Sequence, residues 1–219
     1  MHAEDQIKTQ HQNEISTAVK NGNDIVFVVY SLMEKTEKNI KFALAGILEK
    51  HKRLDLFTPV YSCLKELITN AMKANIKRIL VEEGEIKNSE DRAEAIAKIR
   101  SLLNKKKFLE YGLKAKKHSL STRIYFRTYR NNLYIEVINN TPLTEVEIER
   151  INTKIKKSSE YDNIATFFIE NPDPEAEGMG LGLSMIVVIL KNIHIALNNF
   201  SVTTDGSDNT TAKMLIPLN

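Results

Sequence analysis

Glycine and proline are scarce in this chain of 219 residues, and their scarcity narrows the choice of fold. Eight glycines and five prolines are about half of average usage, which argues against all-β folds rich in tight turns. Three of the eight glycines, Gly178, Gly180 and Gly182, nevertheless lie within five residues. A sequence that otherwise avoids glycine concentrates it at one place, and this place therefore needs a specific reason.

Other absences limit the class of protein. The single cysteine, Cys63, cannot form an intrachain disulfide, and its apolar surroundings predict a buried, unreactive thiol. No apolar run is long enough to cross a bilayer, and the polar N-terminus has no signal-peptide core. The net charge of +3 is too small to indicate a nucleic-acid partner. We therefore expect a cytoplasmic protein with no membrane span and no nucleic-acid partner.

The composition that remains is typical of a globular domain, with 42% hydrophobic and 27% charged residues. The length favours one large domain, so we expect a polar leader over residues 1–23 and a single domain over residues 24–219. Runs of helix and of β-hairpin alternate along the chain. This order predicts an α+β fold, a two-layer sandwich with helices on one face of a mixed, mainly antiparallel sheet.

Each expected element follows from a local pattern of residues. A charge-dense stretch at about 82–118 predicts a helical insertion, which could be a partner surface or a packing element. A long polar segment at 140–177 contains one predicted helix, opened by a capping box at Thr144 and Glu147. The remaining expected elements are a strand at 24–31, helices at 32–53, 59–81 and 181–197, and hairpins at 123–139 and 200–218.

The helix predicted over 59–81 places polar groups along one stripe. At about 100° per residue, Glu66, Asn70, Lys73 and Lys77 share a side of the helix. Leu64 and its apolar neighbours occupy the opposite side. An amide oxygen suits Mg²⁺, an ammonium offsets phosphate charge, and a carboxylate can orient or deprotonate a nucleophile. Taken alone, the stripe is also what an ordinary solvent-exposed helix face looks like.

The glycine cluster, Glu177-Gly178-Met179-Gly180-Leu181-Gly182-Leu183-Ser184, opens a predicted helix. Backbone amides that are freed of Cβ atoms at a helix N-terminus suit a polyphosphate. A flexible hinge or a tight start to the helix would use the same residues.

Together, the motif Glu66-Leu67-Ile68-Thr69-Asn70-Ala71-Met72-Lys73-Ala74 and the downstream Gly-Met-Gly-Leu-Gly-Leu resemble the ATP-binding domain of the GHKL superfamily. The likeness is greatest to its histidine kinase branch and covers residues from about 57 to the C-terminus. It implies a Bergerat-type ATP-binding fold that takes ATP or ADP with Mg²⁺. It also implies that Asn70 binds Mg²⁺, Lys73 contacts phosphate and Glu66 is the general base.

The same resemblance makes Gly178, Gly180 and Gly182 the phosphate-binding box and residues 140–177 the lid over it. The adenine box departs from the family pattern, since Asn139 stands where the family has aspartate. Thr141 and Leu143 replace its two glycines. A neutral acceptor forms a bond weaker by about 1 kcal/mol, so we expect weak ATP binding or a shifted adenine.

The five histidines are the remaining departure from the family. None is followed by an acidic residue, as the phosphoacceptor of sensor kinases is, and the leader is too short for their dimerising hairpin. We therefore expect an ATP-binding, histidine kinase-like ATPase module of signal transduction that phosphorylates or regulates a separate protein partner, as the family's stand-alone anti-sigma-factor kinases do. The alternative is an inactive GHKL-fold scaffold that has lost tight nucleotide binding. A homodimer is left open.

Overall fold

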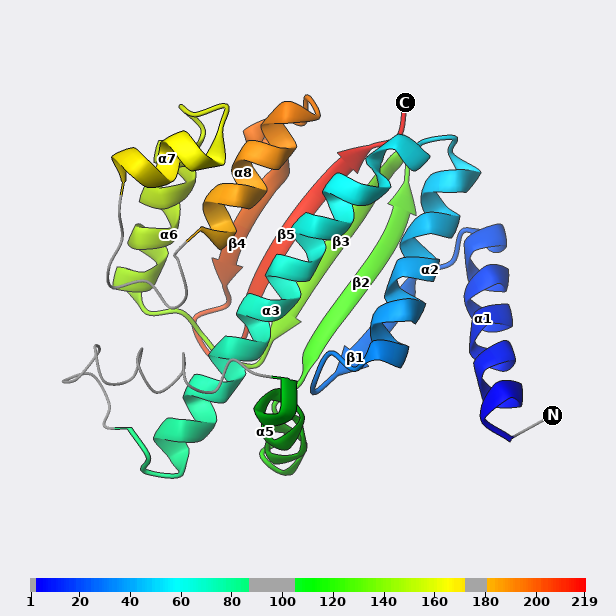
Figure 1. Ribbon diagram of the computed structural model, residues 1–219, viewed down its shortest axis with the longest axis horizontal. Helices are drawn as coiled ribbons and strands as arrows, with labels where there is room; N and C mark the ends of the chain where they lie inside the picture. The colour runs from blue at the N-terminus through cyan, green and yellow to red at the C-terminus, as the bar shows by residue number, and fades with distance from the viewer. Residues whose placement is uncertain (1–2, 87–104, 172–180) are drawn as a thin grey trace.

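The computed structural model describes residues 3–86, 105–171 and 181–219, which form seven α-helices and one five-stranded sheet (Figure 1). The sheet order is β1-β2-β3-β5-β4, and every neighbouring pair in it is antiparallel. The strands are β1 (Ile25–Val29), β2 (Thr122–Tyr129), β3 (Asn132–Asn139), β4 (Phe200–Thr204) and β5 (Thr210–Pro217). The helices are α1 (Ala3–Asn21), α2 (Glu34–Lys50), α3 (Phe57–Glu82), α5 (Lys105–Lys117), α6 (Glu145–Ser158), α7 (Ile164–Glu170) and α8 (Gly182–Asn192).

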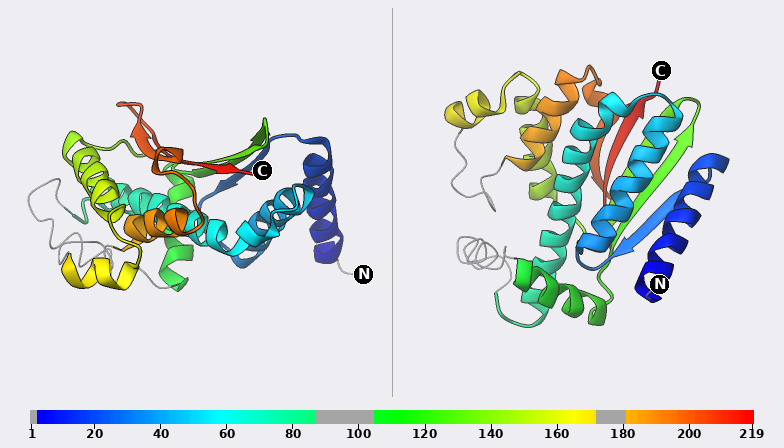
Figure 2. Two further views of the ribbon diagram at one scale, coloured as in Figure 1. Left: turned by 90° about the horizontal axis from the view of Figure 1, so that it is seen from above. Right: turned by 45° about the vertical axis from the view of Figure 1, so that its right-hand side comes forward.

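The helices form one layer and the sheet forms the other, as the view from above shows (Figure 2). Helix α3 crosses the sheet over β3 and β5, with α8 on one side of it and α2 on the other (Figure 1). This arrangement confirms the predicted α+β two-layer sandwich. None of the described helices is both long and apolar enough to cross a membrane.

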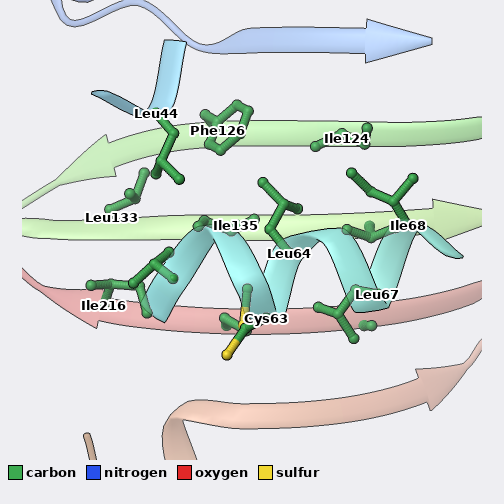
Figure 3. Packing of buried hydrophobic residues seen from close by; sticks show 14 of the residues in the cluster. Leu44, Cys63, Leu64, Leu67, Ile68, Ile124, Phe126, Leu133, Ile135 and Ile216 are labelled. Carbon is green, nitrogen blue, oxygen red and sulfur yellow. The ribbon is translucent and has the colours of Figure 1, made fainter. Parts of the chain in front are cut away.

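The core lies between α3 and the sheet. Leu64 and Ile68 project from α3 onto Ile135 of the central strand (Figure 3), and all three are almost completely buried. The apolar side predicted for this helix is therefore its sheet-facing side. Cys63 belongs to the same core, which confirms its predicted burial, and burial raises the pKa of its thiol to about 12.

A two-residue turn joins β2 to β3. Arg130 and Asn131 both have positive φ, at 47° and 57°, which is the left-handed backbone that tight hairpin turns require. Asn131 adopts this region at little cost because asparagine tolerates it better than most residues. The hairpin predicted over 123–139 is thus confirmed, with β2 beginning one residue earlier, at Thr122.

A second, smaller apolar cluster lies where α3 extends beyond the sheet. Tyr111 and Ala115 of α5 pack there with Ile76, Ile79 and Leu80 of α3, among others. Helix α5 also approaches the end of β1 closely, because a Cβ on Gly112 would lie 2.6 Å from the Cβ of Ser31. The described part of the predicted insertion therefore packs on α3, and residues 87–104 lie outside the described residues.

Three segments differ from their sequence-based expectation. Residues predicted as a polar leader include α1, which packs on α2 with Val19 in contact with Gly46. The long polar segment contains α7 in addition to α6, whose capping box at Thr144 is confirmed. The last helix ends at Asn192 rather than near 197, because His194 turns the backbone to a φ of 59°.

A hydrogen-bonded ion cluster joins α2 to α3. The Tyr61 hydroxyl donates to Glu37 Oε1 at 2.6 Å, and Lys41 and Lys65 place their Nζ atoms 3.1 and 3.4 Å from the same oxygen. The Tyr61 bond and, after it, the two lysines outweigh partial burial and lower the pKa of Glu37 from 4.5 to about 2. The ionised carboxylate is therefore stabilised in the folded state.

This cluster predicts an acid-sensitive contribution to stability. Because the pKa of Glu37 is lower when folded, its contribution is complete above about pH 4.5 and is lost as the pH falls towards 2. We expect Glu37→Gln to lower the free energy of unfolding by about 1 kcal/mol at pH 7, and the gap from wild type to narrow at pH 3. Urea unfolding at both pH values measures it. Glu49→Gln, on the exposed side of α2, is the control. A gap of equal size at pH 7 and pH 3 would show that Glu37 is not the source of the acid-sensitive stability.

Candidate functional site

The stripe predicted from the sequence is present on α3. Glu66, Asn70 and Lys73 are each half-buried, and within the described part of the chain no hydrogen bond or ion pair engages their side chains. The fourth member, Lys77, instead donates to Glu147 of α6 at 3.2 Å. Three side chains of the stripe thus have polar groups available to a ligand, and the fourth connects α3 to α6.

The structure brings the glycine motif onto this stripe. Gly182 begins α8, and a Cβ there would overlap the carboxylate of Glu66, lying 2.6 Å from its Cδ and 2.9 Å from its Cγ. Any side chain at position 182 would therefore displace Glu66 from its present position. The first backbone N–H groups of a helix have no partner within the helix, so the start of α8 is electropositive. The Glu66 carboxylate lies beside this end of the helix. Gly178 and Gly180 lie outside the described residues.

A row of polar side chains ends the inner face of the sheet. Thr122, Asn139 and Thr210 are register partners on β2, β3 and β5, and all three are buried. The next inner-face positions along these strands are apolar, namely Ile124, Val137 and Ala212. The predicted site residue Asn139 is therefore the centre of a polar row at the edge of the hydrophobic core.

Helix α3 covers this row with a second buried asparagine. Asn75 donates from Nδ2 to Thr122 Oγ1 at 3.5 Å and accepts at Oδ1 from the Thr141 hydroxyl at 3.2 Å. The Thr210 hydroxyl donates to the carbonyl of Thr141 at 2.6 Å. Thr141, predicted to lie at the base-binding position, thus belongs to the same network.

One donor in this network has no partner. Nδ2 of Asn139 is buried and makes no hydrogen bond within the described residues, although the residue is only 4% exposed. A buried donor left unsatisfied costs about 1–3 kcal/mol, and such groups in folded proteins call for an explanation. A ligand that supplies an acceptor at this point would remove that cost.

Asn140, the residue after Asn139, connects the loop that follows β3 to α3. Arg78 donates from Nη1 to the carbonyl of Asn140 at 2.7 Å, and Asn140 Oδ1 accepts from the backbone N–H of Ser121 at 3.0 Å. Leu143 donates its backbone N–H to Thr204 Oγ1 at 3.4 Å. Asn139 is therefore held at a defined place at the end of its strand.

The two groups of residues lie on different sides of α3. Asn70 and Asn75 are five residues apart and project about 140° from one another, and no described contact joins Asn139 to the stripe. Sequence reasoning missed Asn75, Thr122 and Thr210. The signal for the two threonines was available, because each interrupts a strand pattern whose other inward positions are apolar.

Comparisons with protein-family models, with curated proteins and with solved structures found no match to this chain. The functional proposal therefore rests on the geometry of the chain's own residues.

Proposed function

We propose that this chain is a Mg-ATP-binding module of the histidine kinase-like ATPase type, which acts on a separate protein partner in signalling. The observation that carries the proposal is the approach of Glu66 to Gly182. Two motifs distant in the sequence meet there, and each has a chemistry suited to a nucleotide phosphate. Neither motif by itself predicts this contact.

The stripe on α3 has the right groups for a metal-bound phosphate. Mg²⁺ prefers oxygen ligands and in nucleotide sites takes only one or two from the protein, with phosphate oxygens and water completing its shell. The Asn70 side-chain oxygen would supply such a ligand, and the Lys73 ammonium would offset phosphate charge. Both side chains are half-buried and free of partners within the described residues, so neither would have to give up a protein contact.

Glu66 would supply the proton chemistry. Its carboxylate lies at the start of α8, where the phosphates would bind the free N–H groups of that helix. From this position it would orient a hydroxyl or water and accept its proton during attack on phosphorus. No histidine precedes an acidic residue, which supports a phosphoryl acceptor on another protein.

The base-binding end favours a second candidate function. Thr141 is bonded to Asn75, and its carbonyl accepts from Thr210, so the position where the family pattern has glycine is occupied by an internal network. A chain that keeps the fold as a binding scaffold and has lost nucleotide turnover would look like this. The same experiment separates the two candidates.

That experiment is a thermal unfolding series with Mg-ATP, with Mg-ADP and with neither. Nucleotide at 100 times its Kd stabilises the native state by about 2.7 kcal/mol, so we expect Tm to rise by roughly 5–10 °C for a chain of this size. Asn70→Ala should abolish most of the rise while unfolding normally without nucleotide. Asn39→Ala, the same change at a half-buried position of α2, should keep the full rise.

No rise at millimolar nucleotide would refute the ATP-binding proposal and leave the scaffold. If Tm rises, γ-labelled ATP incubated with the protein alone and with candidate partners distinguishes hydrolysis from transfer. Label that appears as free phosphate indicates an ATPase, and label on the partner indicates a kinase. If nucleotide raises Tm but the label stays on ATP, the protein is a non-catalytic nucleotide sensor.

A further inference from the structure

Helix α5 is held on the protein by one face, beyond the end of the sheet (Figure 1). Tyr111 and Ala115 are buried on this face, in the cluster that they share with the end of α3. On the same side of the helix, the Lys114 ammonium forms an ion pair with Glu83. Apolar packing and an ion pair therefore fix the orientation of α5, so its opposite face is a defined surface of the protein.

The opposite face of α5 combines exposed leucines with exposed lysines. Leu109 and Leu113 are 48% and 70% exposed, and helical periodicity places them beside one another. Lys116 and Lys117 lie in the last turn and border the leucines on either side. Both lysines are exposed, and no hydrogen bond or ion pair within the described residues engages them. These four residues form the α5 outer face, which has an apolar centre and a basic border.

Helix α5 also concentrates the positive charge of the chain. Its 13 residues include six lysines and one glutamate, a net charge of +5. Because the whole chain carries +3, the other 206 residues together carry −2. The basic charge is therefore local to α5. A second copy of α5 would carry the same charge, so repulsion disfavours a symmetric contact between two copies of the chain through this helix.

We infer that the α5 outer face binds an acidic, amphipathic segment of a partner protein. Carboxylates of such a segment would pair with Lys116 and Lys117, and its apolar side chains would cover Leu109 and Leu113. A nucleic acid would contact the lysines but leave the leucines exposed, and an anionic membrane would need a wider apolar face than two leucines. The inference rests on the proposed function only in expecting a protein partner, and the binding that it describes needs no nucleotide.

Fluorescence anisotropy without nucleotide tests the inference. The probe is a labelled helical peptide with leucines along one face and glutamates at its remaining positions. We expect wild-type protein to bind this peptide with a Kd of about 10–100 μM, because a small exposed surface gives a weak interaction. The same peptide with lysine in place of every glutamate should bind at least about tenfold more weakly, since like charges then meet.

Charge reversal at the end of α5 is the informative variant. Lys116→Glu combined with Lys117→Glu should weaken binding of the acidic peptide at least about tenfold, because two attractions become repulsions. Leu113→Ala should weaken it about threefold, because less apolar surface is covered. The matched control is Lys156→Glu combined with Lys157→Glu, an exposed lysine pair in the last turn of α6. It makes the same change in net charge and should leave the Kd within about twofold of wild type.

The outcomes separate the inference from the proposed function, which the thermal series with nucleotide decides. If the acidic peptide does not bind wild-type protein, the inference is wrong whether or not Mg-ATP raises Tm. An equal loss of affinity in the α6 control would show that net charge alone attracts the peptide, and it would overturn the assignment to α5. Unchanged affinity in Leu113→Ala would do the same for the apolar centre. Tighter binding of anionic phospholipid vesicles or single-stranded DNA through Lys116 and Lys117 would replace the protein partner with a membrane or a nucleic acid.

Discussion

Gly182→Ala is expected to weaken Mg-ATP binding at least about tenfold, equivalent to about 1.4 kcal/mol, with little effect on the nucleotide-free protein. The added Cβ would overlap the Glu66 carboxylate. Glu66 is long and flexible, so its side chain can rotate away without disturbing the fold. The methyl group then occupies space at the start of α8, where phosphates are proposed to bind, and the Glu66 carboxylate leaves its present position there.

The matched control is the same substitution at Gly46 on α2. A Cβ at Gly46 would lie 3.6 Å from the Val19 side chain, which is an ordinary contact. Gly46→Ala should therefore bind nucleotide as the wild type does and should unfold at a slightly higher temperature, because alanine is favoured over glycine inside a helix by about 1 kcal/mol. Calorimetric titration gives the affinities. Wild-type affinity in Gly182→Ala would separate the glycine motif from the nucleotide site.

Leu64→Ala is expected to lower the free energy of unfolding by about 3 kcal/mol. Leu64 is completely buried where α3 meets the central strands (Figure 3). Its truncation leaves a cavity in a layer that cannot collapse readily, because rigid strands line one side and the helix backbone the other. Urea unfolding followed by far-UV circular dichroism measures the loss.

Leu113→Ala on α5 makes the same chemical change at a position that is 70% exposed. It should alter the free energy of unfolding by less than about 0.5 kcal/mol, since no packed contacts are removed. A loss at Leu113 comparable to that at Leu64 would mean that the exposed side of α5 is covered in solution, as by a second copy of the chain.

Local patterns predicted much of the fold because short-range physics determines them. The stripe on α3 follows from helical periodicity, and the β2–β3 hairpin from two alternating strands around a polar turn. The capping box at Thr144 is a contact between residues three apart. Where the local signal was weak, prediction was less accurate. Helix α1 has few apolar residues, and its packing on α2 cannot be read from its own sequence.

The residues of the candidate site were likewise predicted only in part. The residues of the stripe, the glycine motif and Asn139 were identified as chemically interesting from the sequence, and their assignment to nucleotide binding stays a prediction. Asn75 was not identified, because a single buried polar residue on a helix has no signature until its partner is known.

By itself, the sequence determined which residues carry polar chemistry and which face of each element is apolar, because side-chain type and helical or strand periodicity suffice for both. Only the tertiary structure decided that Gly182 lies against Glu66 and that Asn139 has an unpartnered donor while Asn75 is fully bonded. These are contacts between elements far apart in the chain. They depend on how α3 and α8 cross the sheet, and the core between the layers fixes that geometry.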